Sequence, residues 1–167
     1  AIVADNARIF GDAIIAESAT VHGDSIIYGY ARICGESRVS MFAVISGRVW
    51  VTDNADIFGK VEIYNNEYIN GDAEIYKATH LMTISNIGNH EVTTFMRNKG
   101  GKIIVACGGF GFWGTIEEFK KIVKKKLKRT ISGKQYKYAI KLAELSIGDD
   151  MKTEDDKEVS GSWKTNC

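Results

Sequence analysis

The chain has 167 residues, with 22 Lys and Arg against 21 Asp and Glu, so its net charge is close to zero and its length allows one domain or two small ones. No run of about 18 apolar residues is present, which argues against a membrane-spanning helix. Three cysteines lack the spacing of a metal site or a disulfide framework, as expected in a reducing compartment. The first ten residues carry no basic leader before an apolar run, so we expect a cytoplasmic protein.

Charge is distributed unevenly along the chain. Residues 1–90 carry six Lys and Arg against eleven Asp and Glu, a net charge of −5. Residues 91–147 carry thirteen against four, a net charge of +9, and residues 148–167 carry three against six, a net charge of −3. The sequence therefore divides into an acidic first half, a basic second unit and an acidic tail, and the composition of the tail predicts disorder.

A branched aliphatic residue recurs at every sixth position through the first half of the chain. These positions are Val3, Ile9, Ile15, Val21, Ile27, Ile33, Val39, Ile45, Val51, Ile57, Ile63, Ile69, Ile75, Leu81 and Ile87. A small residue, mostly Ala or Ser, stands four positions after most of them, and Gly or Asp commonly stands between. A period of six fits neither an amphipathic helix nor an alternating strand, and it predicts a β-solenoid with turns at the Gly and Asp positions.

This pattern resembles the left-handed parallel β-helix of the hexapeptide-repeat family, in which three hexads make one triangular turn of about 18 residues. The resemblance implies a mainly β fold, with a left-handed parallel β-helix over residues 1–88. It also implies a homotrimer, because proteins of this family are typically trimers with parallel prisms.

Folding the repeat at about 18 residues per turn places several large apolar residues on one outer face. They are Phe10, Ile14, Tyr28, Trp50, Tyr64 and Tyr68. Soluble monomers rarely expose a contiguous apolar patch of this kind. We therefore predict that this face is buried, either as the oligomer interface or against the second unit. A surface on which a ligand stacks is the alternative interpretation.

Glu67 breaks the hexad pattern, because it stands at an inward position that small residues usually fill. An unpaired carboxylate in an aliphatic core is costly. Two interpretations stay open at this point: a distorted corner turns Glu67 outward, or Glu67 lines a pocket near Tyr64 and Tyr68.

The second unit, residues 89–147, is predicted to be a small α+β module of ββαα order. Residues 92–96 and 102–107 alternate as two strands of a hairpin. Thr115 and Glu118 form the capping-box pattern at the start of a helix. We expect Ser132 and Gly133 to break the chain before a second helix over residues 134–145. The module should pack on the open end or the side of the solenoid, and the charged tail, residues 148–167, should be disordered.

The combination of this repeat with the second unit resembles phage and prophage proteins of unassigned function. In those proteins the turn after the second strand is shorter and of Cys-Gly-Cys-Phe type, whereas here Gly109 stands in place of the second cysteine. The residues that carry the resemblance are Thr94, Phe95, Gly101, Ile104, Val105, Cys107, Gly108, Gly114, Thr115, Glu118 and Phe119.

Two neighbouring stretches are candidates for anion binding. Glycine-rich backbone at a helix N-terminus can hold a phosphate or carboxylate, and the candidates there are Gly109, Gly111, Gly114 and Thr115. A cationic run follows over residues 120–141, with ten Lys and Arg and no acid. Such a run is either a solvated helix face or an electrostatic binding surface. Its candidate binding residues are Lys120, Lys121, Lys124, Lys125, Lys128 and Arg129.

Enzymatic chemistry finds little support in the sequence. Acyltransferases of the hexapeptide-repeat family use a histidine base and a loop that interrupts the prism, but these hexads run without insertion. His22, His80 and His90 lack the spacing of a three-histidine metal site. Cys107 near a helix start is a candidate nucleophile or a buried structural cysteine. We predict no cofactor and no metal.

We therefore expect a non-enzymatic, oligomeric binding protein of phage or mobile-element type. It would capture an anionic ligand, such as a nucleotide signal, or an acidic host factor, and so inhibit a host defence. Two alternatives are an acyltransferase that uses acyl-CoA, with His22 or His80 as base, and a structural assembly subunit. Sequence-specific DNA binding is not expected, because no nucleic-acid-binding motif accompanies the basic run, and no membrane partner is expected either.

Overall fold

Thirteen two-residue strands follow one another through the first half of the chain in the computed structural model, which describes residues 1–88 and 91–147. They are β1 (Ile2–Val3), β2 (Arg8–Ile9), β3 (Ile14–Ile15), β4 (Thr20–Val21), β5 (Ile26–Ile27), β6 (Arg32–Ile33), β7 (Arg38–Val39), β8 (Val44–Ile45), β9 (Trp50–Val51), β10 (Asp56–Ile57), β11 (Glu62–Ile63), β12 (Tyr68–Ile69) and β13 (Glu74–Ile75). The tail predicted to be disordered lies outside the described residues.

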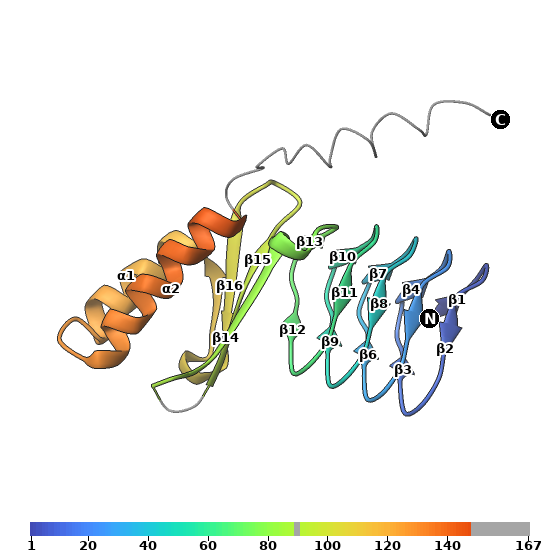
Figure 1. The fold of residues 1–167 in the computed structure, drawn as a ribbon, viewed down its shortest axis with the longest axis horizontal. Coiled ribbons are helices and arrows are strands. Elements are labelled where there is room, and N and C mark those ends of the chain that lie inside the picture. The colour runs from blue at the N-terminus through green and yellow to red at the C-terminus, as the bar shows by residue number, and fades with distance from the viewer. Residues whose placement is uncertain (89–90, 148–167) are drawn as a thin grey trace.

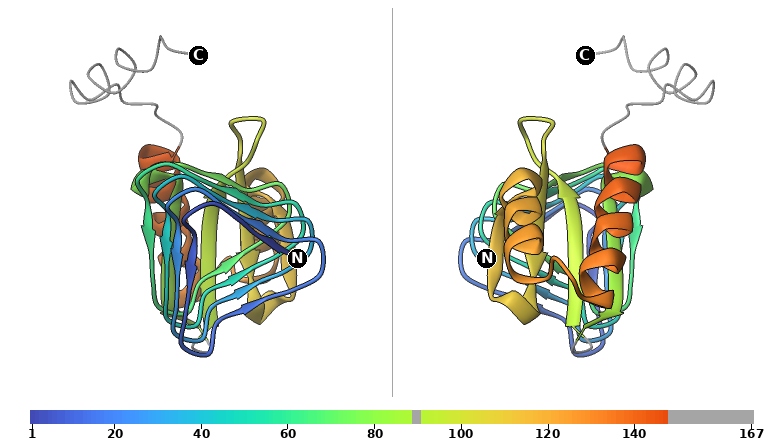
Figure 2. Two further views of the ribbon diagram at one scale, coloured as in Figure 1. Left: turned by 90° about the vertical axis from the view of Figure 1, so that its right-hand side faces the viewer. Right: turned by 90° about the vertical axis from the view of Figure 1, so that its left-hand side faces the viewer.

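These strands form three parallel sheets that wind into a solenoid with a triangular outline (Figure 2). Sheet A has the order β1-β4-β7-β10-β13, sheet B the order β11-β8-β5-β2, and sheet C the order β12-β9-β6-β3. Paired residues are 18 positions apart, as in Val21 with Val39. Three strands complete one turn, so thirteen strands make just over four turns. The predicted parallel β-helix is confirmed.

The second residue of each strand points inward and repeats in the same place on every turn. From Val21 to Ile75 these aliphatic side chains are at most 3% exposed, and together with the small residues they form one continuous core. The corner glycines allow the turns to stack closely. Gly35 has a φ of +69°, and a Cβ added to it would lie 2.6 Å from the backbone nitrogen of Asp53 on the next turn.

A four-stranded antiparallel sheet, here called the end sheet, lies across the end of the solenoid (Figure 1). Its strands are β14 (Leu81–Ile87), β15 (Glu91–Arg97), β16 (Ile103–Cys107) and β17 (Phe112–Thr115), in that order. Short 3-10 helices, η1 (Ala78–His80) and η2 (Gly108–Phe110), lie between strands. Met96, Ile104 and Ala106 join the solenoid core, so the open end of the prism is covered by apolar side chains.

The turn between β15 and β16 fastens the end sheet to the last turn of the solenoid. The backbone nitrogen of Lys99 donates to the carbonyl of Asp72 at 3.0 Å, and the side-chain amide of Asn98 donates to the Asp72 carboxylate at 3.2 Å. Arg97 forms an ion pair with Glu74. These polar contacts fix the position of the second unit, which the sequence had left open between the end and the side of the prism.

Two helices, α1 (Ile116–Lys126) and α2 (Ile131–Ile147), cover the other face of the end sheet (Figure 1). Phe95, Val105 and Cys107 of the sheet pack with Phe119 and Tyr136 of the helices in a second core. The predicted hairpin, the first helix with its capping box, and the second helix are confirmed.

Three details differ from the sequence-based prediction. The segment Leu81–Ile87 is a strand of the end sheet, although its hexad spacing had assigned it to the solenoid. Strand β17 lies in the glycine-rich stretch before the first helix, where the predicted ββαα order had no strand, and it pairs with β16 in antiparallel register. The second helix begins at Ile131, so Ser132 and Gly133 lie in its first turn and do not break the chain. The break falls instead between the two helices, at residues 127–130.

Substitution of Gly35 by Ala tests the close stacking of turns. A left-handed backbone costs an L-residue about 1–2 kcal/mol, and the added methyl group also meets the backbone of Asp53. We expect Gly35→Ala to lower the free energy of urea unfolding by more than about 2 kcal/mol. Gly111→Ala is the control, since Gly111 has a φ of +53° but no atom within 4 Å of an added Cβ. Equal losses for the two variants would contradict close stacking as the cause.

Candidate functional site

A groove between α1 and α2 combines charged side chains with an apolar floor. The two helices pack on the end sheet through one face each, with Phe119 and Ala143 fully buried. Helix α1 starts in a complete capping box: the hydroxyl of Thr115 accepts from the backbone N–H of Glu118, whose carboxylate accepts from the backbone N–H of Thr115. Both helices are therefore held firmly, and their outer sides form the two walls of the groove.

The groove has an apolar floor and a cationic rim. Its floor is formed by Val123, Leu127 and Ile140, of which Val123 and Ile140 are buried. Its volume is about 800 Å³. Six lysines line it: Lys120 and Lys124 from α1, Lys128 from the turn between the helices, and Lys134, Lys137 and Lys141 from α2. The four-residue spacing of Lys120 and Lys124 places them along one side of α1, and spacings of three and four place Lys134, Lys137 and Lys141 along one side of α2.

Only one of these lysines is neutralised by nearby acids in the described part of the chain. Lys120 Nζ lies 2.6 Å from a carboxylate oxygen of Glu117 and also pairs with Glu144 across the groove. Hydrogen bonds to these two carboxylates raise the pKa of Lys120 above its ordinary value. No ion pair to Lys124, Lys128, Lys134, Lys137 or Lys141 forms among the described residues. Five cations therefore stand around an apolar floor.

The structure divides the lysines and arginine that the sequence singled out. Lys120, Lys124 and Lys128 line the groove, whereas Lys121, Lys125 and Arg129 do not. The opposite wall was missed, since Lys134, Lys137 and Lys141 had been placed on a helix but not proposed as binding residues. Their spacing of three and four residues indicates that they share one side of α2. Only the packing of α1 against α2 directs the lysines of both helices toward one groove.

The glycine-rich stretch before α1 is separate from this groove. Gly109, Gly111, Gly114 and Thr115 are not among the residues that line it. At the helix N-terminus the carboxylate of Glu118 already accepts hydrogen bonds from the N–H and the hydroxyl of Thr115. These hydrogen bonds lower the pKa of the Glu118 carboxyl. The carboxylate of Glu118 thus occupies the position at the helix N-terminus where a phosphate would bind, so this geometry does not support a phosphate site there.

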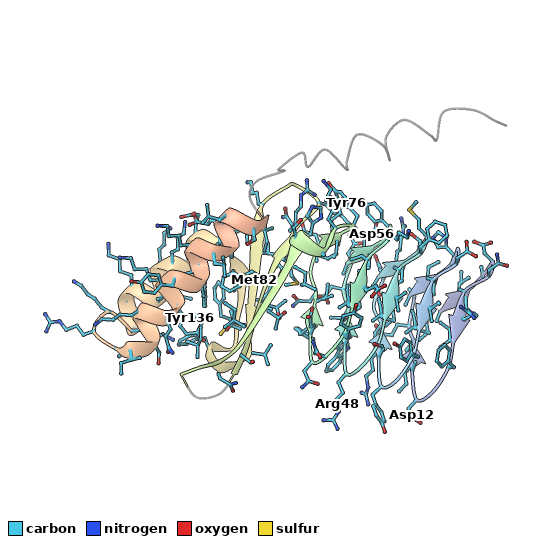
Figure 3. The ribbon with its side chains drawn as sticks, viewed as in Figure 1. Asp12, Arg48, Asp56, Tyr76, Met82 and Tyr136 are labelled. Carbon is cyan, nitrogen blue, oxygen red and sulfur yellow. The ribbon has the colours of Figure 1, made fainter. Side chains whose placement is uncertain are left out.

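The aromatic residues predicted to share one face are divided between two sheets on either side of a corner. Phe10, Tyr28 and Tyr64 directly follow strands of sheet B, while Ile14, Trp50 and Tyr68 begin strands of sheet C. Figure 3 labels Asp12 and Arg48, which lie at this corner between the two columns. Sheets B and C meet at an angle in the triangular cross-section (Figure 2), so the two columns face different directions.

Stacking orders the side chains within each column. The rings of Phe10 and Tyr28 are stacked with centroids 5.1 Å apart, and those of Trp50 and Tyr68 meet edge to face at 5.6 Å. The guanidinium of Arg32 lies 5.9 Å from the centre of the Trp50 ring. Phe10 and Trp50 nevertheless keep 52% and 45% of their surface exposed. The end sheet and the helices do not cover this corner.

The histidines do not converge on a common site. His22, which follows β4, places Nδ1 3.8 Å from a carboxylate oxygen of Asp5. His80 is buried in η1 against the ring of Tyr76, with centroids 4.2 Å apart. Three turns of sheet A, at β7, β10 and β13, separate the two positions. His90 lies outside the described residues.

Cys107 is a buried member of the second core. It is 1% exposed, and the hydroxyl of Thr93 donates to its sulfur at 3.1 Å. Within residues 1–88 and 91–147, no group of three or more His, Cys, Asp and Glu side chains is placed to hold a metal ion. No helix in those ranges is long and apolar enough to cross a membrane.

Glu67 lies at the junction of the solenoid and the end sheet. Its Oε2 is buried and has no hydrogen-bond partner among the described residues, so the interpretation in which it turns outward to solvent does not hold for that oxygen. Burial raises the pKa of this carboxyl from its ordinary value of 4.5 to about 7. Its sequence neighbours Asn66 and Tyr68 line a cavity of about 290 Å³.

The raised pKa of Glu67 predicts a pH-dependent stability. Because folding favours the protonated acid, its burial costs nothing below the unfolded pKa of about 4.5. The cost grows as pH rises from there and is complete above about pH 7. Partial exposure reduces that cost to about 1–2 kcal/mol. We expect Glu67→Gln to raise the free energy of unfolding by that amount at pH 8 but not at pH 4.5, measured in urea. A gain of equal size at both pH values would contradict this assignment.

Comparison of the chain with protein-family models, with curated proteins and with solved structures finds no match in any of the three.

Proposed function

We propose that this protein is a non-enzymatic binding protein that captures an acidic partner in the groove between α1 and α2. The observation that carries the proposal is the pair of lysine rows facing each other across an apolar floor. Leu127, which is only partly buried, gives this floor an apolar surface that a partner can reach.

The chemistry of the groove selects a partner with two properties. The floor of Val123, Leu127 and Ile140 favours an apolar surface, and the lysine rim favours carboxylates or phosphates on both sides of it. An amphipathic helix with acidic flanks has this arrangement, and helices commonly bind in apolar grooves of this kind. An acidic amphipathic segment of another protein is therefore the partner that fits best.

Charge reversal in the groove tests this function. We expect a labelled amphipathic peptide, with Leu on one side and Glu on the other, to bind the wild-type protein in a fluorescence anisotropy titration. The double variant Lys124→Glu, Lys137→Glu reverses one charge on each wall and should weaken binding at least about tenfold. Binding should also weaken as salt concentration rises.

The matched control reverses the same number of charges outside the groove. Lys121 and Lys125 lie on α1, but neither lines the groove. The double variant Lys121→Glu, Lys125→Glu should therefore bind the peptide within about twofold of wild type. A scrambled peptide of the same composition controls for net charge. If both double variants lose affinity equally, or the scrambled peptide binds as well, attraction is non-specific and the groove is not the site.

The aromatic corner is, in this proposal, the surface for self-association. Its two columns, Phe10, Tyr28 and Tyr64 on sheet B and Ile14, Trp50 and Tyr68 on sheet C, differ from each other. In a ring of three copies each subunit meets its two neighbours through different surfaces. Two unlike columns beside one corner suit that arrangement, with the corner directed at the three-fold axis.

Light scattering after size exclusion tests the trimer. We expect three times the mass of the chain at micromolar concentration. A charge at a buried aromatic contact should weaken assembly by at least about 2 kcal/mol, so Trp50→Glu should shift the protein toward monomer. Ile2 is an exposed apolar residue on sheet A, outside the two columns, so Ile2→Glu should leave the trimer intact. A wild-type monomer, or equal dissociation by both variants, would contradict the proposal.

A further inference from the structure

The chain continues for twenty residues beyond Ile147, the last residue of α2. These residues, 148–167, are here called the acidic tail, and they lie outside the residues that the structure describes. Its acids are Asp149, Asp150, Glu154, Asp155, Asp156 and Glu158. Residues 148–158 thus hold six acids against two lysines, a net charge of −4. This charge follows directly on the helix that forms one wall of the groove.

The groove between α1 and α2, here called the lysine groove, holds positive charge that the described residues do not neutralise. Six lysines and one acid line it, and that acid, Glu144, pairs with Lys120. Lysines three or four positions apart on a helix have Cβ atoms about 5–6 Å apart, which is less than the screening length of about 8 Å at physiological salt. Carboxylates placed between them relieve their repulsion. A segment with several closely spaced acids is therefore the occupant that this charge favours.

The acidic tail starts at one end of the lysine groove. Lys120 near the start of α1 pairs with Glu144 near the end of α2, so the C-terminal end of α2 lies at one end of the groove and the turn between the helices at the other (Figure 1). Lys137 is ten residues before Ile147, about 15 Å along the helix. Glu154 is seven residues beyond Ile147, and an extended chain of that length spans about 23 Å. The later acids of the tail can therefore fold back to the middle of the groove.

The outer side of α2 is apolar and is not covered by other described residues. It carries Ile131, Tyr138, Leu142 and Leu145, which are 77%, 73%, 52% and 60% exposed. At 3.6 residues per turn, the three lysines of α2 lie between this surface and Ile140 of the groove floor. A segment bound along these lysines has apolar surface on both sides of it, and the tail supplies Met151, Val159 and Trp163.

Attachment to α2 makes even a weak contact effective. A short linker gives an attached segment an effective concentration in the millimolar range near its site. With three large apolar residues among twenty, the tail buries less apolar surface on the floor than a segment with a complete apolar face. Binding of the tail therefore depends mainly on charge, and a partner with such a face can displace it.

We propose that the acidic tail binds in the lysine groove of its own chain and competes there with the acidic partner. This regulation rests on the proposed function, because the tail and the partner share one surface. The partner binds only the fraction of molecules whose groove is free, which lowers its apparent affinity by that fraction. Partners that also fill the apolar floor displace the tail, whereas segments that offer acids alone do not.

Removal of the negative charge of the tail in the full-length protein tests this competition. The neutral-tail variant carries Asp149→Asn, Asp150→Asn, Glu154→Gln, Asp155→Asn, Asp156→Asn and Glu158→Gln. We expect it to bind the labelled amphipathic peptide at least about tenfold more tightly than wild type in fluorescence anisotropy at low salt. The two affinities should approach each other as salt concentration rises, because salt screens the contact between tail and groove.

A matched pair of variants separates competition from net charge. Asp155→Asn, Asp156→Asn removes two charges from the tail and should raise peptide affinity at least about twofold. Asp24 and Glu36 are exposed residues of the solenoid, so Asp24→Asn, Glu36→Gln removes the same charge far from the groove and should leave affinity unchanged. Equal gains for the two variants would overturn the proposal.

Zero-length cross-linking of the wild-type protein detects the contact without a peptide. A carbodiimide joins a carboxylate to an amine in direct contact with it, and mass spectrometry identifies the joined residues. We expect links from residues 154–158 to Lys124, Lys137 or Lys141 of the same chain, in a mixture of unlabelled and isotope-labelled protein that reveals links between chains. Links only to lysines outside the groove, such as Lys60, or only between chains would overturn the proposal.

The two measurements together separate this proposal from the proposed function. If the peptide binds wild type and the neutral-tail variant equally and no links to the groove form, the tail is not a competitor, whereas partner binding in the groove stands. If neither protein binds the peptide but links to the groove form, the tail occupies the groove and the proposed acidic partner is wrong.

Discussion

The stacking of each turn on the next is the constraint on which the rest of this structure depends. Backbone donors of one turn bond to carbonyls of the following turn, as from Arg38 to Ala55 at 2.9 Å. A stack built this way leaves unpaired backbone groups and an open core at its last turn. The end sheet covers that core with Met96, Ile104 and Ala106, and its outer face then needs the two helices. The groove between those helices is thus a consequence of how the last turn of the solenoid is covered.

Sequence periodicity predicted the solenoid because every turn repeats the same local environment, and it predicted the capped helix because capping is local. It failed at Leu81 and Ile87, whose six-residue spacing suits an extended strand equally well. On a regular strand both would face the same side, but a register shift between Ile84 and Ile87 turns Ile87 into the helix-side core. The hexad spacing there is therefore a coincidence that only the pairing of β14 with β15 reveals.

The candidate sites were less predictable, because each is formed by elements distant in sequence. The lysines of α1 were recognised, but those of α2 gained meaning only from helix packing. The aromatic set was placed on one face even though the turn predicted at Gly11 lies between Phe10 and Ile14, because the angle between the two sheets that meet there belongs to the tertiary structure. Glu67 was visible as an exception to the repeat, but its burial depends on the end sheet above it. Local rules identified the unusual residues, and tertiary packing decided their surroundings.

The 18-residue register also makes the turn a unit of length. Adding or removing 18 residues would place every inward residue over another inward residue, as Val39 lies over Val21, and would leave both the end sheet and its contacts in place. A change of six or twelve residues would keep the inward positions inside but would place each column over a different sheet, and a change that is not a multiple of six would bring outward residues into the core. The distance between the first turn and the lysine groove can therefore vary in steps of about 4.8 Å, so the solenoid is in effect an adjustable spacer that carries a fixed binding unit.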